Sequence, residues 1–278
     1  MLLLGVQGIG SFLALLLFVW IVTPRRNPIS AIGFAFRRAW EARSGRIAIA
    51  AVTTVITVNY LEGCCDPAVT RWLGWDVTPF VRSIEGDFVG LLQAATPHAL
   101  VVPLALVYVP GYLAILNAPL VLWSTSEDHR VAGRYALAFV LNYVVALPFF
   151  LLAPVREVGW SGLSTATPLL DSVWPGITEQ LRAGSPLDNC FPSMHVSCAV
   201  TTLWYIHAHG PPRLRCIGWV IVPAIVVSTM VLGIHWATDV IAGVVVGLGC
   251  CAVADRVLSA RAHGTKRARI DDVDGVAE

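Results

Sequence analysis

The chain has 278 residues, of which 56% are hydrophobic and only 13% are charged. Soluble domains carry about 25% charged residues, and several apolar runs here reach the roughly 20 residues that a helix needs to cross a bilayer. The composition therefore excludes an ordinary soluble domain and predicts an integral membrane protein. The net charge of +1, with no zinc-finger spacing and no glycine-rich phosphate loop, gives no case for a nucleic-acid partner.

The apolar runs predict an all-α integral membrane protein of about seven transmembrane helices, with the candidate catalytic bundle in its C-terminal half. In chain order, the expected spans are residues 2–22, 47–61, 98–122, 135–153, 192–209, 216–234 and 238–254. We divide the chain into N-terminal transmembrane and interfacial helices, a core and a polar cytoplasmic tail, at residues 1–134, 135–258 and 259–278. The first span lacks a basic start and a cleavage site, so a removed signal peptide is not expected.

Two further helices are expected to lie on the membrane surface. In the basic stretch after the first span, Phe36 and Trp40 fall on one helical face, which is typical of an amphipathic interfacial helix. A second such helix is predicted where apolar residues recur at helical spacing between 80 and 92. Gly243 and Gly247 predict close packing of the last span against a neighbouring helix. The tail after Arg256 is expected to be disordered.

Positive charge sets the orientation of the predicted spans. Alternating sides through seven spans puts 15 of the 19 Lys and Arg residues on one face of the membrane. The four on the other face are Arg71, Arg82, Arg156 and Arg182. Because cytoplasmic loops are enriched in Lys and Arg, we predict a multi-pass plasma-membrane protein with its N-terminus outside and its C-terminus in the cytoplasm. His195 and His235 then share the outer face.

The fifth predicted span opens with Phe191-Pro192-Ser193-Met194-His195, where a polar loop turns into an apolar run. Proline is compatible with the first turn of a helix, where its missing N–H costs nothing. Such a turn leaves backbone N–H groups unpaired and carries the positive end of the helix dipole, which suits an anion. The stretch therefore predicts an anion site with a hydroxyl and an imidazole in the same turn.

His235 and Asp239 are spaced to share one face of a helix at the start of the last span. Ionisable groups near a bilayer are costly and are functional by default. A carboxylate beside an imidazole orients it and makes its other nitrogen a better nucleophile, while His195 could protonate a leaving oxygen. Together these are the parts for phosphoryl transfer through a phosphohistidine. Interfacial histidines, a helix-surface pair or half of a metal site remain alternatives.

Both stretches resemble motifs of the type-2 phosphatidic acid phosphatase superfamily. Pro192 to His195 matches its Pro-Ser-x-His motif, and Ser228 to Asp239 is similar to its Ser-Arg-x5-His-x3-Asp motif; the resemblance covers roughly residues 135–255. It implies that His235 is the nucleophile, Asp239 its partner and His195 the general acid. It also implies that Ser193 and nearby backbone N–H groups hold phosphate oxygens, with no metal and no cofactor.

The chain departs from the family pattern at the cationic groups that clamp phosphate. The first family motif, Lys-x6-Arg-Pro, is absent, since the only lysine is Lys266, and Thr229 replaces the arginine of the third motif. Phosphoryl transfer depends on positioning and charge stabilisation. We therefore predict that Arg156, whose guanidinium can bind phosphate through two hydrogen bonds, completes a phosphate site with Pro192, Ser193 and Thr229. An interfacial anchor is the alternative role for Arg156.

These departures are similar to the inositol phosphorylceramide synthase branch, whose members move a phosphorylated headgroup from one lipid to an alcohol. Two enzymatic predictions follow, namely hydrolysis of a lipid phosphate and transfer of an inositol phosphate or related headgroup to a lipid alcohol. The non-enzymatic alternative is a seven-span transporter or receptor, which predicts polar groups near the membrane midplane. A disulfide between Cys190 and Cys64 or Cys65 also stays open.

Overall fold

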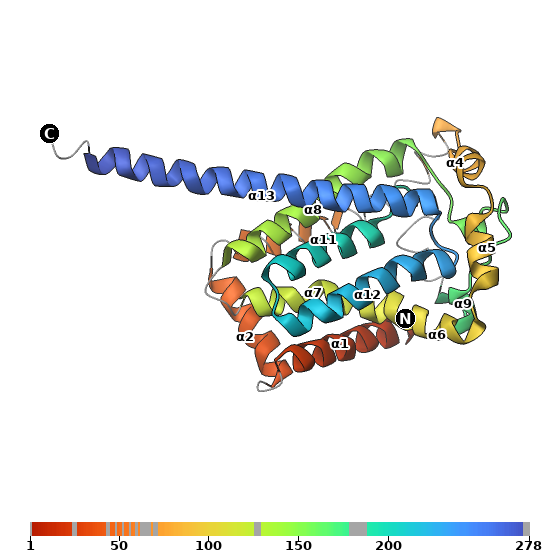
Figure 1. Ribbon diagram of the computed structural model, residues 1–278, viewed down its shortest axis with the longest axis horizontal. Coiled ribbons are helices and arrows are strands. Elements are labelled where there is room, and N and C mark those ends of the chain that lie inside the picture. Colours follow the sequence, from red (N-terminus) through yellow and green to blue (C-terminus); the bar gives the residue numbers. More distant parts are fainter. Residues whose placement is uncertain are drawn as a thin grey trace.

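The computed structural model of the chain shows a helical bundle (Figure 1). It describes residues 2–274 except 24–26, 43–44, 48, 52, 56, 59–60, 62–67, 69–71, 125–128 and 178–187. Within that part of the chain there is no β-strand, and one isolated bridge pairs Val155 with Asn189. The all-helical prediction is confirmed.

The helices follow one another along the chain with short connections. Their bounds are α1 (Leu2–Val22), α2 (Pro28–Glu41), α4 (Thr78–Glu85), α5 (Phe88–Ala95), η1 (His98–Leu100), α6 (Val101–Leu106), the π-helical η2 (Val107–Gly111), α7 (Tyr112–Ser124), α8 (His129–Leu152), η3 (Val158–Trp160), α9 (Leu170–Val173), α11 (Met194–His209), α12 (Pro212–Val231) and α13 (Ala237–Asp274).

Among the described residues, four helical segments are long and apolar enough to cross a membrane. They are His98–Trp123, Arg130–Leu152, Pro212–Val231 and Ala237–Ser259. These segments match the third, fourth, sixth and seventh predicted spans and indicate a membrane protein. α1 coincides with the first predicted span, whereas the second, 47–61, includes residues outside the described part of the chain. The total of seven spans therefore stays a prediction.

α11 lies at the centre of the bundle, in contact with α7, α8, α12 and α13 (Figure 1). Its 16 residues make it only about 24 Å long, shorter than the roughly 30 Å hydrocarbon core. Because its neighbours cover it, α11 can bury polar groups such as Ser197, Thr201 and Thr202 without exposing them to lipid. Its sequence is consequently less apolar than that of the four long spans.

α13 packs closely against the start of α11, as its glycines predict. A Cβ added at Gly243 would lie 2.6 Å from the Ser193 carbonyl oxygen, and one at Gly247 would lie 2.6 Å from that of Ser197. α13 begins at the same end of the bundle as α11, near α4 and α5, and extends past the opposite end, where α2 lies (Figure 1). Its backbone is helical to Asp274 rather than disordered after Arg256, in a segment rich in good helix formers.

The predicted surface helices form with one change. α2 is continuous, and its exposed Phe36 and Trp40 rings stack with centroids 6.3 Å apart. The stretch between 80 and 92 is not one helix, because Gly86 adopts a left-handed conformation (φ +61°) that separates α4 from α5. Asp87 then accepts hydrogen bonds from Ser164 and Thr165, which hold the pKa of its carboxyl below the ordinary value.

Candidate active site

The turn between α12 and α13 sets the position of His235. The chain leaves α12 through Gly233, whose left-handed conformation (φ +78°) favours glycine. The backbone N–H groups of Ile234 and His235 then both donate to the Thr229 carbonyl oxygen at 3.0 Å. His235 therefore lies in the turn before α13 and not on the helix itself, as its spacing from Asp239 had predicted.

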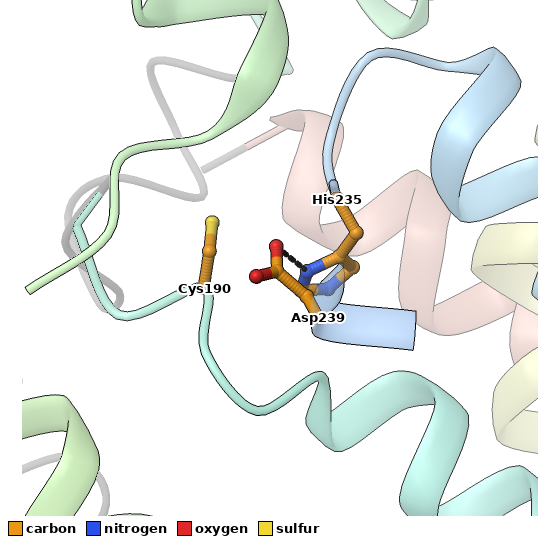
Figure 2. A group of neighbouring side chains, drawn as sticks. All are labelled: Cys190, His235 and Asp239. Carbon is orange, nitrogen blue, oxygen red and sulfur yellow. Dashed lines mark ion pairs between the residues drawn. The ribbon is translucent and has the colours of Figure 1, made fainter. Parts of the chain in front are cut away.

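Asp239 lies in the first turn of α13 and faces His235. Its Oδ2 accepts a hydrogen bond from the Trp236 backbone N–H at 2.9 Å and lies 3.4 Å from Nδ1 of His235. Figure 2 shows the carboxylate turned toward the imidazole. The first-turn carboxylate thus both caps the helix and pairs with the histidine.

The pair is shielded from solvent. His235 is 5% exposed and Asp239 is fully buried. Burial lowers the pKa of His235 to about 4, which the backbone of Cys190 offsets in part, so the imidazole is neutral at pH 7. Within the described residues, neither ring nitrogen of His235 nor Oδ1 of Asp239 makes a hydrogen bond of normal geometry. Buried polar atoms of this kind are uncommon, and they leave bonding capacity for a ligand.

The start of α11 meets the start of α13, so the two sequence stretches come together. Ser193 caps α11, with its Oγ accepting from the Val196 N–H at 3.3 Å, and its own N–H donates to the Asp239 carbonyl oxygen at 3.1 Å. The rings of His195 and His235 lie with their centroids 5.8 Å apart. One small group bound between these rings would be in reach of both imidazoles.

Two tyrosines that the sequence did not single out hold the His195 ring. Oη of Tyr108 lies 3.1 Å from Nε2 of His195, and the ring centroids of Tyr108 and Tyr112 lie 4.8 and 4.9 Å from that of the imidazole. Both come from η2 and the start of α7, where π-helical turns often mark functional sites. An aromatic residue in a predicted span gave no sequence signal for this role.

Glu85 of α4 is a second residue that sequence patterns missed. Its carboxylate accepts hydrogen bonds from the backbone N–H groups of Ala237 and Thr238 at 3.1 and 2.8 Å, and from the Thr238 hydroxyl at 2.8 Å. Glu85 therefore neutralises the positive end of α13. A phosphate is left with the start of α11, where the N–H groups of Met194 and His195 have no acceptor within the helix.

The remaining predicted phosphate ligands point elsewhere. The Arg156 guanidinium is 45% exposed and pairs with Asp76 at 2.5 Å. Burial raises the pKa of Asp76, but hydrogen bonds from Thr78 and Arg156 outweigh burial and lower it below the ordinary value. The Arg156 carbonyl oxygen accepts from the Trp236 indole at 2.8 Å, so its backbone does border the site.

Thr229 and Pro192 occupy structural positions. The Thr229 hydroxyl donates to the Val226 carbonyl oxygen of its own helix at 2.8 Å, while its carbonyl holds the His235 turn. Pro192 is buried directly before the cap of α11. Phosphate binding by Arg156, Thr229 and Pro192 stays a prediction.

Cys190 is the further side chain at the pair. Its Sγ, a nitrogen of His235 and a carboxylate oxygen of Asp239 all lie within 4.8 Å of one another, so these residues are the described group that could hold a metal ion. The proposed disulfide partners Cys64 and Cys65 lie outside the described residues.

Fold and site together define a helical membrane protein with a buried His–Asp pair facing a second histidine. The family model of the PAP2 superfamily matches residues 76–253. The chain belongs to the PAP2 superfamily, whose members are phosphatases or phosphotransferases. The match begins well before residue 135, where the motif resemblance started, and so includes Glu85 and Tyr108. Searches of curated proteins and of solved structures gave no match.

Proposed function

We propose that the protein transfers the phosphoryl group of a lipid phosphate, at the outer face of the membrane, through a phosphohistidine intermediate on His235. The observation that carries this proposal is the site itself. A buried neutral imidazole lies beside Asp239, and its ring is 5.8 Å from that of His195. A nucleophile, a partner for its developing charge and a proton donor are thus within reach of one phosphorus atom.

Binding would place the phosphate at the start of α11. The N–H groups of Met194 and His195 and the hydroxyl of Ser193 are the donors at that helix end, where the dipole favours an anion. Arg156 would add a cationic contact by leaving Asp76, from a backbone position that the Trp236 indole already fixes.

The reaction then proceeds in two balanced steps. Nε2 of His235 attacks phosphorus in line as the bond to the leaving oxygen breaks, and His195 gives that oxygen a proton. Asp239 beside Nδ1 stabilises the imidazolium that forms. Water or an alcohol next attacks the phosphohistidine, His195 takes its proton, and the P–N bond breaks to restore neutral His235.

A lipid substrate is supported by the apolar surface at the site end of the bundle. Phe80, Ile84, Phe88 and Leu91 of α4 and α5 are all largely exposed. Clustered apolar side chains on a surface indicate contact with a membrane or another apolar partner. Action at the outer face is supported by charge, since the basic helix α2 lies at the opposite end of the bundle (Figure 1).

A second candidate is transfer of inositol phosphate or a related headgroup to a lipid alcohol. It is favoured by the burial of the pair, with Asp239 fully shielded, because a closed site limits access of bulk water to a reactive intermediate. The replacement of the arginine of the third family motif by Thr229 is in keeping with this branch.

The test is product analysis with the purified full chain in lipid nanodiscs. A phospholipid carrying labelled phosphate is incubated with and without candidate lipid alcohols. Release of free phosphate supports hydrolysis, whereas a new labelled lipid supports transfer. His98→Ala is the matched control, because His98 is an exposed histidine at the same end of the bundle. No labelled product under any condition would contradict the proposed function.

A further inference from the structure

Cys190 is a buried side chain at the site that the proposed mechanism does not use. Its backbone N–H donates to the Val155 carbonyl oxygen at 3.1 Å, which fixes the segment just before α11. Its Sγ lies 3.6 Å from the Ile234 carbonyl oxygen, within hydrogen-bond distance for sulfur. Hydrogen bonds on two sides thus hold the thiol beside the turn that carries His235 (Figure 2).

We propose that Cys190, His235 and Asp239 form an inhibitory site for a thiophilic divalent cation, with Zn²⁺ as the best fit. Thiolate, imidazole and carboxylate together suit Zn²⁺, whereas Mg²⁺ and Ca²⁺ prefer oxygen ligands alone. All three side chains are buried, and each offers one ligand atom to the same small volume.

The distances are close to those that a tetrahedral ion requires. Zinc bonds of about 2.0–2.3 Å put ligand atoms about 3.3–3.7 Å apart. Nδ1 of His235 and Oδ2 of Asp239 are already 3.4 Å apart. The three ligand atoms lie within 4.8 Å of one another, so the sulfur needs to approach by about 1 Å at most.

Two of the ligand groups also have unused bonding capacity. Nδ1 of His235 and Oδ1 of Asp239 make no normal hydrogen bond among the described residues. A cation between the side chains would satisfy buried polar atoms that otherwise carry a desolvation penalty. Binding would release the proton of the Cys190 thiol, because the thiolate is the ligand form.

A cation in this place would stop phosphoryl transfer. It would occupy Nδ1 of His235, replace the carboxylate contact of Asp239 and withdraw electron density from Nε2, the attacking atom. This inhibitory consequence rests on the proposed function, whereas metal binding itself does not.

The experiment measures both binding and activity with the full-length protein in detergent. Equilibrium dialysis against Zn²⁺ with elemental analysis should give one ion per wild-type chain. Cys190→Ala should bind it at least roughly tenfold more weakly, as loss of a ligand requires. Cys250→Ala is the matched control, since Cys250 is a buried cysteine of α13 that is not part of the cluster and should bind like the wild type. Co²⁺ should show a thiolate charge-transfer absorption that Cys190→Ala lacks.

The activity arm separates this proposal from the proposed function. Zn²⁺ should inhibit the wild type, and Cys190→Ala should keep its basal turnover but need at least roughly tenfold more Zn²⁺ for the same inhibition. No stoichiometric binding, or equal binding by the wild type and Cys190→Ala, would overturn the metal site even if the enzyme is active. Cys190-dependent binding without turnover would sustain the metal site and refute the enzymatic proposal.

Discussion

Replacing Glu85 with glutamine should slow the chemical step while leaving substrate binding largely intact. The carboxylate accepts three hydrogen bonds from the first turn of α13, and a glutamine has one acceptor oxygen to offer them. Hydrogen bonds to a charged group contribute about 1.5–3 kcal/mol each. Losing about 2 kcal/mol of this support at the turn that aligns His235 with Asp239 corresponds to a rate constant roughly 30-fold lower.

The assay is single-turnover formation of the phosphoenzyme, together with steady-state kcat and KM. Because the substrate phosphate binds at the start of α11, Glu85→Gln should lower kcat with little change in KM. Glu41→Gln, an exposed glutamate at the end of α2 far from the site, is the control. An unchanged rate constant with a lower melting temperature would show that Glu85 only stabilises the fold, and a rise in KM alone would place it in substrate binding.

Three further predictions concern packing, phosphate binding and pH. Gly243→Ala should destabilise the fold by about 1–3 kcal/mol, since its Cβ would lie 2.6 Å from the Ser193 carbonyl oxygen; thermal unfolding measures this, and an unchanged melting temperature would contradict the packing. Arg156→Lys should raise KM because a lysine lacks the planar fork that binds two phosphate oxygens; unchanged kinetics would make Arg156 a partner of Asp76 alone. Burial lowers the pKa of His235 to about 4, so its imidazole stays neutral, and phosphoenzyme formation should not lose His235 to protonation between pH 7 and pH 5, and should fail only toward pH 4. An acid limb near pH 6.5, assigned to His235 by its variant, would show that the nucleophile is not buried in the working enzyme.

The meeting of the two motifs was predictable from the sequence. Each motif begins a helix, and the loop charges place both starts on one side of the membrane. The close approach of α13 to α11 was also legible, because Gly243 and Gly247 are spaced one helical turn apart on one face. These features depend on local patterns and on alternation of the chain through the membrane, both of which a sequence records.

The residues that support the histidines were not predictable in this way. Glu85 reaches Thr238 across 153 positions of sequence, and Tyr108 reaches His195 across 87. Nothing in the local sequence distinguishes a carboxylate that caps a distant helix from one that faces solvent. Likewise, the spacing of Arg156 after α8 indicated its place beside the site, but not that Asp76 would take its guanidinium.

The central claim is that His235 carries the phosphoryl group, and direct detection of that intermediate tests it most directly. The purified chain would be mixed with a lipid phosphate carrying labelled phosphorus, quenched in alkali within the first turnover, and digested for mass spectrometry. The account predicts an acid-labile phosphoryl group on the peptide that contains His235, and its absence from His235→Ala together with loss of turnover. Turnover by His235→Ala, or by a wild type that never carries phosphate on His235, would contradict it.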